Sequence, residues 1–158
     1  MAKPDKTNVM RILDQKKINY QHYCYDNTSA VSGVEVAKAL DQNPEQVFKT
    51  LVTVSGTGMH YVFVIPVAEE LDLKKAAKAV GEKSIAMLKS KELLPLTGYI
   101  HGGCSPIGMK KFFTTVIDET AQLFDTIIFS AGKIGHQVEF SKEDLKNVIA
   151  FTFSDLTV

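Results

Sequence analysis

The chain reads Val47-Phe-Lys-Thr-Leu-Val-Thr-Val-Ser-Gly-Thr-Gly-Met-His-Tyr-Val-Phe-Val-Ile-Pro-Val67 in its central part. β-Branched and aromatic residues fill two runs, 47–54 and 60–67, as is typical of strands. Between the runs lies Ser55-Gly56-Thr57-Gly58, whose glycines suit a turn. The sequence therefore predicts a β-hairpin, which supplies two neighbouring strands of a sheet.

On both sides of this hairpin, shorter segments alternate between helical and extended patterns. Thr7, Asp72 and Ser141 precede apolar-periodic segments and are typical helix caps, and Gly81 is a typical helix terminator. Helices are predicted near 8–17, 33–41, 73–80, 90–94, 118–123 and 142–148, and further strands near 18–25, 84–88, 114–117, 126–130, 136–140 and 149–153. This interleaving predicts a mixed α/β fold: a single domain over 1–158, built on one irregular, barrel-like sheet flanked by short helices.

The composition excludes several classes of protein. With 45% hydrophobic and 23% charged residues over 158 positions, the chain is neither disordered nor a coiled coil. No run approaches the ~20 apolar residues that span a membrane, and residues 1–6 are too polar to open a secretory signal. We therefore expect a cytoplasmic protein without a membrane partner.

Metal and disulfide chemistry have little support in the sequence. Cys24 and Cys104 are too few for a disulfide framework or a zinc site, so reduced thiols are expected. His22, His60 and His136 follow no metal-ligand spacing. Neither a metal nor an organic cofactor is predicted.

The formal charge is zero, but it is unevenly distributed. The segment 74–111 carries eight lysines and two glutamates, whereas the segments 18–73 and 112–158 are acidic. A lysine-rich segment is either a solvated face or a docking surface for a polyanion. Arg11 is the one arginine, so bidentate reading of guanine edges in DNA is not expected, while lysine contacts to a phosphate backbone remain open.

Two features depart from ordinary core patterning. The segment Gly98-Tyr99-Ile100-His101-Gly102-Gly103-Cys104-Ser105-Pro106-Ile107-Gly108 is neither a P-loop nor a dinucleotide fingerprint. Its unshielded backbone N–H groups suit an oxyanion or a carbonyl oxygen, although a structural turn is the alternative. The second feature is Lys49, inside an otherwise apolar strand, which either reaches the rim or lines a pocket.

Together these motifs resemble the bacterial Cys-tRNA(Pro) deacylase family, also called YbaK, which is related to the insertion domain of prolyl-tRNA synthetases. The resemblance rests on Phe48-Lys49-Thr50-Leu51, Leu71-Asp72-Leu73-Lys74-Lys75-Ala76-Ala77-Lys78, Thr97-Gly98-Tyr99 with the rest of the glycine-rich loop, and Ser130-Ala131-Gly132-Lys133. It implies a trans-editing enzyme that removes cysteine from mischarged Cys-tRNA(Pro), binds the tRNA acceptor end and works beside prolyl-tRNA synthetase.

The resemblance also implies a mechanism in which the substrate supplies the nucleophile. The thiol of the misattached cysteine attacks its own ester carbonyl, so the protein has to orient the substrate and stabilise the oxyanion. Lys49 and Gly102 match the family's catalytic positions. Substrate-binding residues are expected among Tyr25, Thr50, Tyr99, Gly103 and Ser105.

Some positions depart from the family pattern. Ile134 stands where many members carry arginine, and Gln137 stands where they often carry a small polar or acidic residue. These differences leave open a water-using deacylase for another small aminoacyl group such as Ala-tRNA(Pro), or a non-catalytic module that binds tRNA or synthetase. Cys104 near His101 also suggests a protein nucleophile, to which the resemblance assigns no role.

Overall fold

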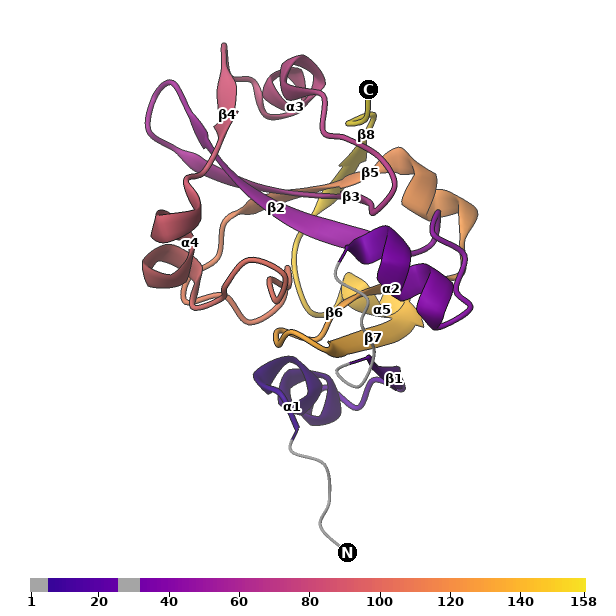
Figure 1. Ribbon diagram of the computed structural model, residues 1–158. Coiled ribbons are helices and arrows are strands. Elements are labelled where there is room, and N and C mark those ends of the chain that lie inside the picture. Colours follow the sequence, from indigo (N-terminus) through magenta and orange to yellow (C-terminus); the bar gives the residue numbers. More distant parts are fainter. Residues whose placement is uncertain (1–5, 26–31) are drawn as a thin grey trace, which may run out of the picture.

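The structure is a computed structural model that describes residues 6–25 and 32–158. It confirms the mixed α/β class (Figure 1), but the strands form two sheets instead of one barrel-like sheet. Val47 and Ile128 form an isolated parallel bridge between these sheets. The two sheets do not close into a barrel, because among the described residues no strand pairing other than this bridge joins them.

The larger sheet has the strand order β4-β2-β3-β5-β8. Its centre is the hairpin of β2 (Phe48–Ser55) and β3 (His60–Pro66), paired antiparallel from Phe48–Pro66 to Val54–His60, which confirms the prediction. β4 (Ile85–Met87) pairs only with the last three residues of β2, Thr53 to Ser55. On the other side, β5 (Thr114–Asp118) and β8 (Thr152–Ser154) add in parallel.

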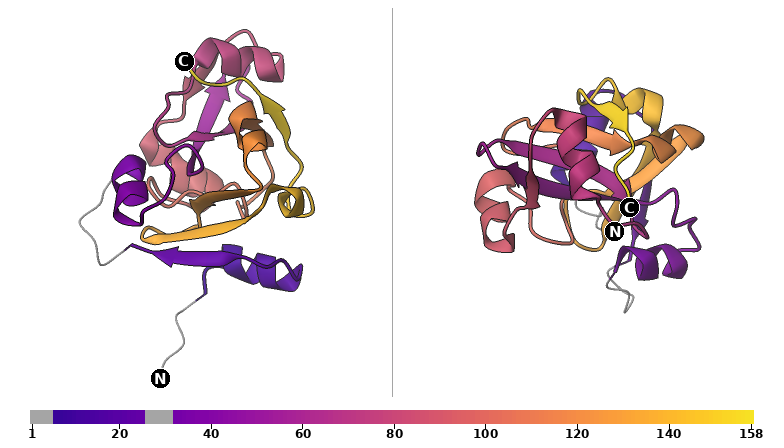
Figure 2. Two further views of the ribbon diagram at one scale, coloured as in Figure 1. Left: turned by 90° about the vertical axis from the view of Figure 1, so that its right-hand side faces the viewer. Right: turned by 90° about the horizontal axis from the view of Figure 1, so that it is seen from above.

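The smaller sheet has the order β1-β7-β6 and is antiparallel. Its strands are β1 (Gln21–Cys24), β6 (Thr126–Ser130) and β7 (His136–Ser141). β1 is an edge strand from the opposite end of the chain, and Tyr25 follows it directly. Figure 2 shows α1 and β1 at one end of the molecule and α3 at the other, beside the C-terminus.

The helices begin and end close to the predicted positions. They are α1 (Asn8–Gln15), α2 (Gly33–Ala39), α3 (Leu73–Val80), α4 (Ser90–Thr97) and α5 (Lys142–Leu145), and residues Glu119–Leu123 form a 3-10 helix. Asp72 accepts hydrogen bonds from two backbone N–H groups of α3, and Gly81 ends that helix with φ 73°. α5 is shorter than expected, because residues beyond Leu145 form turns.

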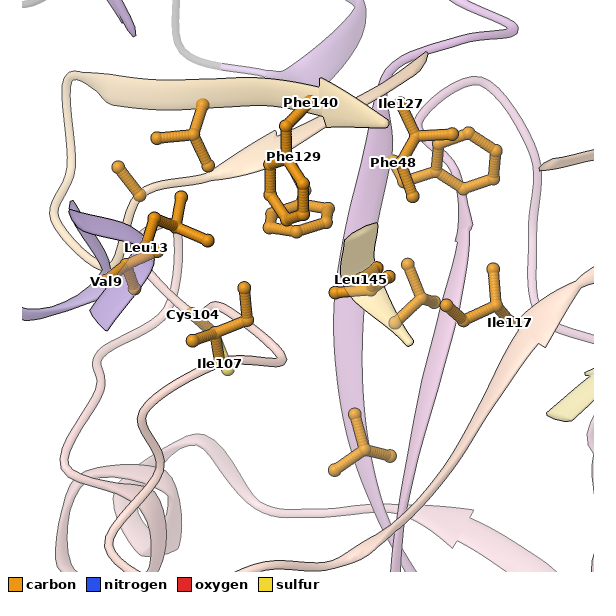
Figure 3. Close-up of a cluster of buried hydrophobic side chains, with 14 of the residues drawn as sticks. Val9, Leu13, Phe48, Cys104, Ile107, Ile117, Ile127, Phe129, Phe140 and Leu145 are labelled. Atoms are coloured by element: carbon orange, nitrogen blue, oxygen red, sulfur yellow. The ribbon is translucent and has the colours of Figure 1, made fainter. Parts of the chain in front are cut away.

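The main core lies between the two sheets. Figure 3 shows Phe48 of β2 together with Phe129 and Phe140 of the smaller sheet and Val9 and Leu13 of α1. Each such side chain contributes roughly 1.5–3 kcal/mol by leaving water. A second cluster, which includes Phe63 and Ile65, packs under α3 on the opposite face of the hairpin. Because β3 is covered on both faces, residues Tyr61 to Val67 are all buried and the hairpin forms a rigid frame.

Candidate active site

A cavity of about 440 Å³ opens beside the first half of β2. Its walls come from residues 47–52, the start of α2, residues between 87 and 93, and the glycine-rich loop. Tyr25, Val67, Ser130 and Gln137 complete the lining. The volume is in the range of small-molecule sites. The cavity exists because β4 covers the edge of β2 only from Thr53 onward, which leaves the earlier part of that edge open.

Lys49 projects into this cavity from β2 and is half-buried. Its pKa is lowered from the ordinary lysine value, chiefly because burial disfavours the charged form, while the charges of Glu70 and Glu69 act in the opposite direction. Within residues 6–25 and 32–158, the side chain of Lys49 makes no hydrogen bond or salt bridge. The lysine is therefore a cation or hydrogen-bond donor held ready for a ligand.

Thr50 adds a second unsatisfied group to the same strand. Its Oγ1 is buried and finds no hydrogen-bond partner among the described residues. The Val52 carbonyl accepts a bond from the N–H of Leu88 on the β4 side. Because backbone groups two residues apart point to the same edge of a strand, the N–H and C=O of Thr50 also face the open edge. A ligand bound at this edge could therefore form hydrogen bonds with both the hydroxyl and the backbone of Thr50.

Gly102 faces the cavity from the glycine-rich loop. It has φ 87°, a left-handed conformation that favours glycine, and a Cβ there would lie 3.7 Å from Ile134. Its N–H has no hydrogen-bond partner in the described part of the chain. Gly103 differs, because its N–H donates to the carbonyl of Ile100 at 3.0 Å. Of the two adjacent glycines, Gly102 is the one with a backbone donor available to an oxyanion.

Tyr99, Gly103 and Ser105 do not line the cavity. The Tyr99 hydroxyl donates to the Ile107 carbonyl inside the protein, and burial raises the pKa of Tyr99 to about 12. Ser105 Oγ accepts a hydrogen bond from the N–H of Ile107. Gly103 packs closely against the backbone of Ile134: a Cβ at position 103 would lie only 3.0 Å from the Ile134 backbone nitrogen. In this structure these residues support the loop, and direct substrate contact by them stays a prediction.

The structure thus brings together Lys49, Thr50, Tyr25 and Gly102 around one cavity. Other lining residues carry no recognisable motif in the sequence, among them Ser32, which caps α2, Val36 of α2, and Met87, Leu88, Ser90 and Leu93. Gln137, which departs from the family pattern, also lines the cavity, as does Ser130, its partner in the β6–β7 pair.

Cys104 also borders the cavity, but its environment does not suit a nucleophile. The side chain is buried, and burial raises the pKa of its thiol to about 12. At neutral pH almost no thiolate is present, and the thiolate is the reactive form. The structure therefore disfavours the alternative of a nucleophilic Cys104.

Among the described residues, no three His, Cys, Asp or Glu side chains gather in a way that would hold a metal ion. None of the helices in those residues has the length and apolar character needed to cross a membrane.

The half-buried lysine, the glycine-rich loop and the hairpin beside the cavity all lie within residues 28–148. These residues match the family model described as an aminoacyl-tRNA editing domain. The chain belongs to the aminoacyl-tRNA editing domain family.

Particular relatives agree with this assignment. A protein of Enterococcus faecalis (strain ATCC 700802 / V583), EbsC, is provisionally named a Cys-tRNA(Pro)/Cys-tRNA(Cys) deacylase; it is 47% identical over 156 residues, which cover 96% of this chain and 93% of that protein. A solved structure described provisionally as a trans-editing enzyme for prolyl-tRNA synthetase has a TM-score of 0.81 at 22% identity and covers 98% of this chain and 99% of its own. A hypothetical protein, APE2540, has a TM-score of 0.84 at 20% identity, with 95% and 99% covered. At these identities the two structures show the fold alone.

Proposed function

We propose that this chain is a trans-editing deacylase that removes cysteine from mischarged Cys-tRNA(Pro). The observation that carries the proposal is that Lys49 and Gly102, whose N–H has no partner among the described residues, line the same small cavity in a chain of the editing-domain family. The name of its 47% identical relative specifies cysteine as the amino acid to test first.

The reaction needs no nucleophile from the protein. The thiol sulfur of the misattached cysteine attacks the ester carbonyl carbon, the bond to the ribose oxygen breaks, and the amino acid leaves as a cyclic thiolactone. The thiol proton ends on the ribose hydroxyl. This chemistry fits a site whose own cysteine, Cys104, is buried with its pKa raised to about 12.

Lys49 and Gly102 serve the two oxygens of the ester. The Gly102 N–H donates to the carbonyl oxygen as it gains negative charge, and a fixed donor of this kind typically contributes about 2.7–4 kcal/mol to the transition state. The Lys49 ammonium stabilises the charge that develops on the departing ribose oxygen. Tyr25, at the end of β1, walls the aminoacyl pocket, while Thr50 offers its unpaired hydroxyl to the substrate.

The tRNA acceptor end is the macromolecular substrate, and prolyl-tRNA synthetase is the proposed partner. The cavity has room for an aminoacyl group and a sugar but not for a tRNA body, so tRNA identity is delegated to the synthetase that releases the mischarged product. The structural neighbour described as a trans-editing enzyme for prolyl-tRNA synthetase supports this partnership. Such work places the protein in the cytoplasm.

Lys49→Ala is the variant that tests the proposal. Release of cysteine from Cys-tRNA(Pro) should fall at least ~100-fold, because the charge on the leaving oxygen is no longer offset. Lys38→Ala, on the exposed side of α2, is the matched control and should keep the wild-type rate. A wild-type rate for Lys49→Ala would contradict the role given to this lysine.

A panel of substrates separates this function from its alternatives. Cys-tRNA(Pro) and Cys-tRNA(Cys) should be deacylated, whereas Cys-tRNA(Pro) methylated at sulfur should not, because its nucleophile is blocked. Hydrolysis of the methylated substrate or of Ala-tRNA(Pro) would indicate activated water instead. Tight tRNA binding with no turnover of any substrate would indicate a non-catalytic module.

A further inference from the structure

The wall of the cavity formed by residues 87–93 carries exposed lysines at its outer surface. Met87, Leu88, Ser90 and Leu93 line the cavity, while Lys89 and Lys91 alternate with them in sequence and are exposed. Neither lysine forms a salt bridge with any described residue. Their charges are therefore available to a partner at the cavity mouth.

The basic surface continues away from the mouth along α4. Lys110 Nζ lies 3.4 Å from the carbonyl oxygen of Pro95, near the C-terminal end of this helix. We use the term α4 surface for the exposed side chains of Met87, Lys89, Lys91, Leu94 and Lys110. Met87 is 46% exposed and Leu94 is 51% exposed, so apolar area lies among the lysines.

The opposite side of the cavity is acidic. Residues 32–47 and 67–72, which include α2 and the turn after β3, contain six acidic residues and one lysine. Glu69 and Glu70 of this turn are close enough to raise the pKa of Lys49, against the lowering by burial. Figures 1 and 2 show α4 and α2 well apart, and the cavity contacts both. On the α4 side, residues 87–97 carry Lys89, Lys91 and one exposed glutamate, Glu92, which leaves one excess positive charge, to which Lys110 adds another. The mouth therefore has a weakly positive side and an acidic side.

We infer that the acceptor end of tRNA enters the cavity across the α4 surface, with Lys89 and Lys91 contacting the phosphates next to the ester. The inference rests on the proposed function and adds the direction of approach. A polyanion is attracted to the α4 side and repelled from the α2 side, and Met87 offers an apolar contact to the terminal base. Lysine contacts to phosphate do not distinguish one nucleotide sequence from another. This agrees with the proposal that prolyl-tRNA synthetase, and not this chain, selects the tRNA.

The test compares two double variants on two substrates. Lys89→Glu/Lys91→Glu reverses the α4 surface, and Lys74→Glu/Lys78→Glu reverses two exposed lysines on α3, none of whose residues lines the cavity. The substrates are Cys-tRNA(Pro) and cysteinyl-adenosine, which has the same ester but no phosphate. The first variant should lose about tenfold or more in kcat/KM on the tRNA through KM, with a salt slope about 1.5 units shallower because two phosphate contacts are lost. On cysteinyl-adenosine both variants should stay within about twofold of wild type, and so should the α3 variant on tRNA.

Two results would overturn the inference: wild-type kcat/KM of the α4 variant on tRNA, or an equal loss on both substrates, which would place these lysines within the reaction itself. If wild type hydrolyses neither substrate, the proposed function fails. The docking surface is then judged by fluorescence anisotropy with tRNA(Pro), where the α4 variant alone should bind about tenfold more weakly.

Discussion

Gln42, just after α2, donates a 2.8 Å hydrogen bond from its Nε2 to the Oε1 of Gln137 in β7. Gln137 is 4% exposed and lines the cavity, whereas Gln42 does not. The bond occupies the carbonyl end of the Gln137 amide, so the Nε2 end is the one left for a ligand. A residue outside the cavity thus orients a polar group inside it.

Gln42→Leu should lower kcat/KM for Cys-tRNA(Pro) about fivefold, which corresponds to about 1 kcal/mol for one hydrogen bond. The Gln137 amide becomes free to rotate, so the loss should differ between Cys-tRNA(Pro) and Ala-tRNA(Pro). Initial rates on both substrates measure it, with the exposed Gln15→Leu in α1 as control. Equal, small changes in Gln42→Leu and Gln15→Leu would show that the orientation of Gln137 is unimportant.

Lys49→Met should inactivate the protein without reducing its thermal stability. Burial lowers the Lys49 pKa, so between the folded-state value and the ordinary value of 10.5 the unfolded chain holds more protons. At every pH below its folded-state pKa, the lysine therefore lowers the free energy of unfolding by the full cost of burying its charge. This penalty disappears as the pH rises toward 10.5. Melting temperatures should be equal to or above wild type at pH 7, with the difference shrinking in alkali. A Tm several degrees below wild type at pH 7 would show that Lys49 supports the fold.

Local chemistry explains which elements were predictable from the sequence. The hairpin follows from two β-branched runs around glycines, and α3 follows from Asp72 and Gly81, whose cap and left-handed φ are present as expected. The division into two sheets depends instead on pairs such as His22–Val138, which lie more than 100 residues apart. No local pattern determines which of several short strands finds which partner.

The candidate site divides in the same way. Lys49 and Gly102 were identified through motif resemblance, and both line the cavity. Tyr99 and Ser105 belong to the same glycine-rich loop as Gly102, yet their side chains are buried and do not line the cavity. Proximity in sequence does not determine the direction in which a side chain points. Gln42 had no sequence signal at all, since its role arises from the packing of α2 near β7.

Tyr99→Phe tests whether Tyr99 supports the loop or touches the substrate. Removing the hydroxyl leaves the buried Ile107 carbonyl without its donor, which should cost about 1–3 kcal/mol in the free energy of unfolding. Urea denaturation measures this cost. Tyr61→Phe is the control, because its hydroxyl bonds Glu82 nearer the surface and the loss should be smaller. A raised KM with unchanged stability would instead support direct contact of Tyr99 with substrate.

Cys104→Ala should retain deacylation within about threefold, because a thiol whose pKa is raised to about 12 supplies almost no thiolate at pH 7. The same property predicts slow alkylation. With iodoacetamide at pH 7.5, mass spectrometry should find exposed Cys24 modified well before buried Cys104. Rapid labelling of Cys104 accompanied by loss of activity would revive a nucleophilic role for it.

Acidification should loosen β1. His22 Nε2 and His136 Nδ1 are 3.0 Å apart across the β1–β7 pair and share one hydrogen bond. If both rings were protonated, the two facing nitrogens would each carry a hydrogen, the bond would be lost, and two positive charges would lie in contact. The His22 pKa is lowered, first by burial and then by the charge of His136. A base with a lowered folded-state pKa favours folding at high pH, and this contribution is lost as the pH falls below its unfolded value near 6.5. Between pH 7.5 and 5, the protection factors of the amides of Gln21 to Cys24, each taken against the intrinsic exchange rate at the same pH, should fall while those of β6 do not. His22→Phe should remove this difference, and a fall in protection that persists in the variant would assign the pH dependence to other groups.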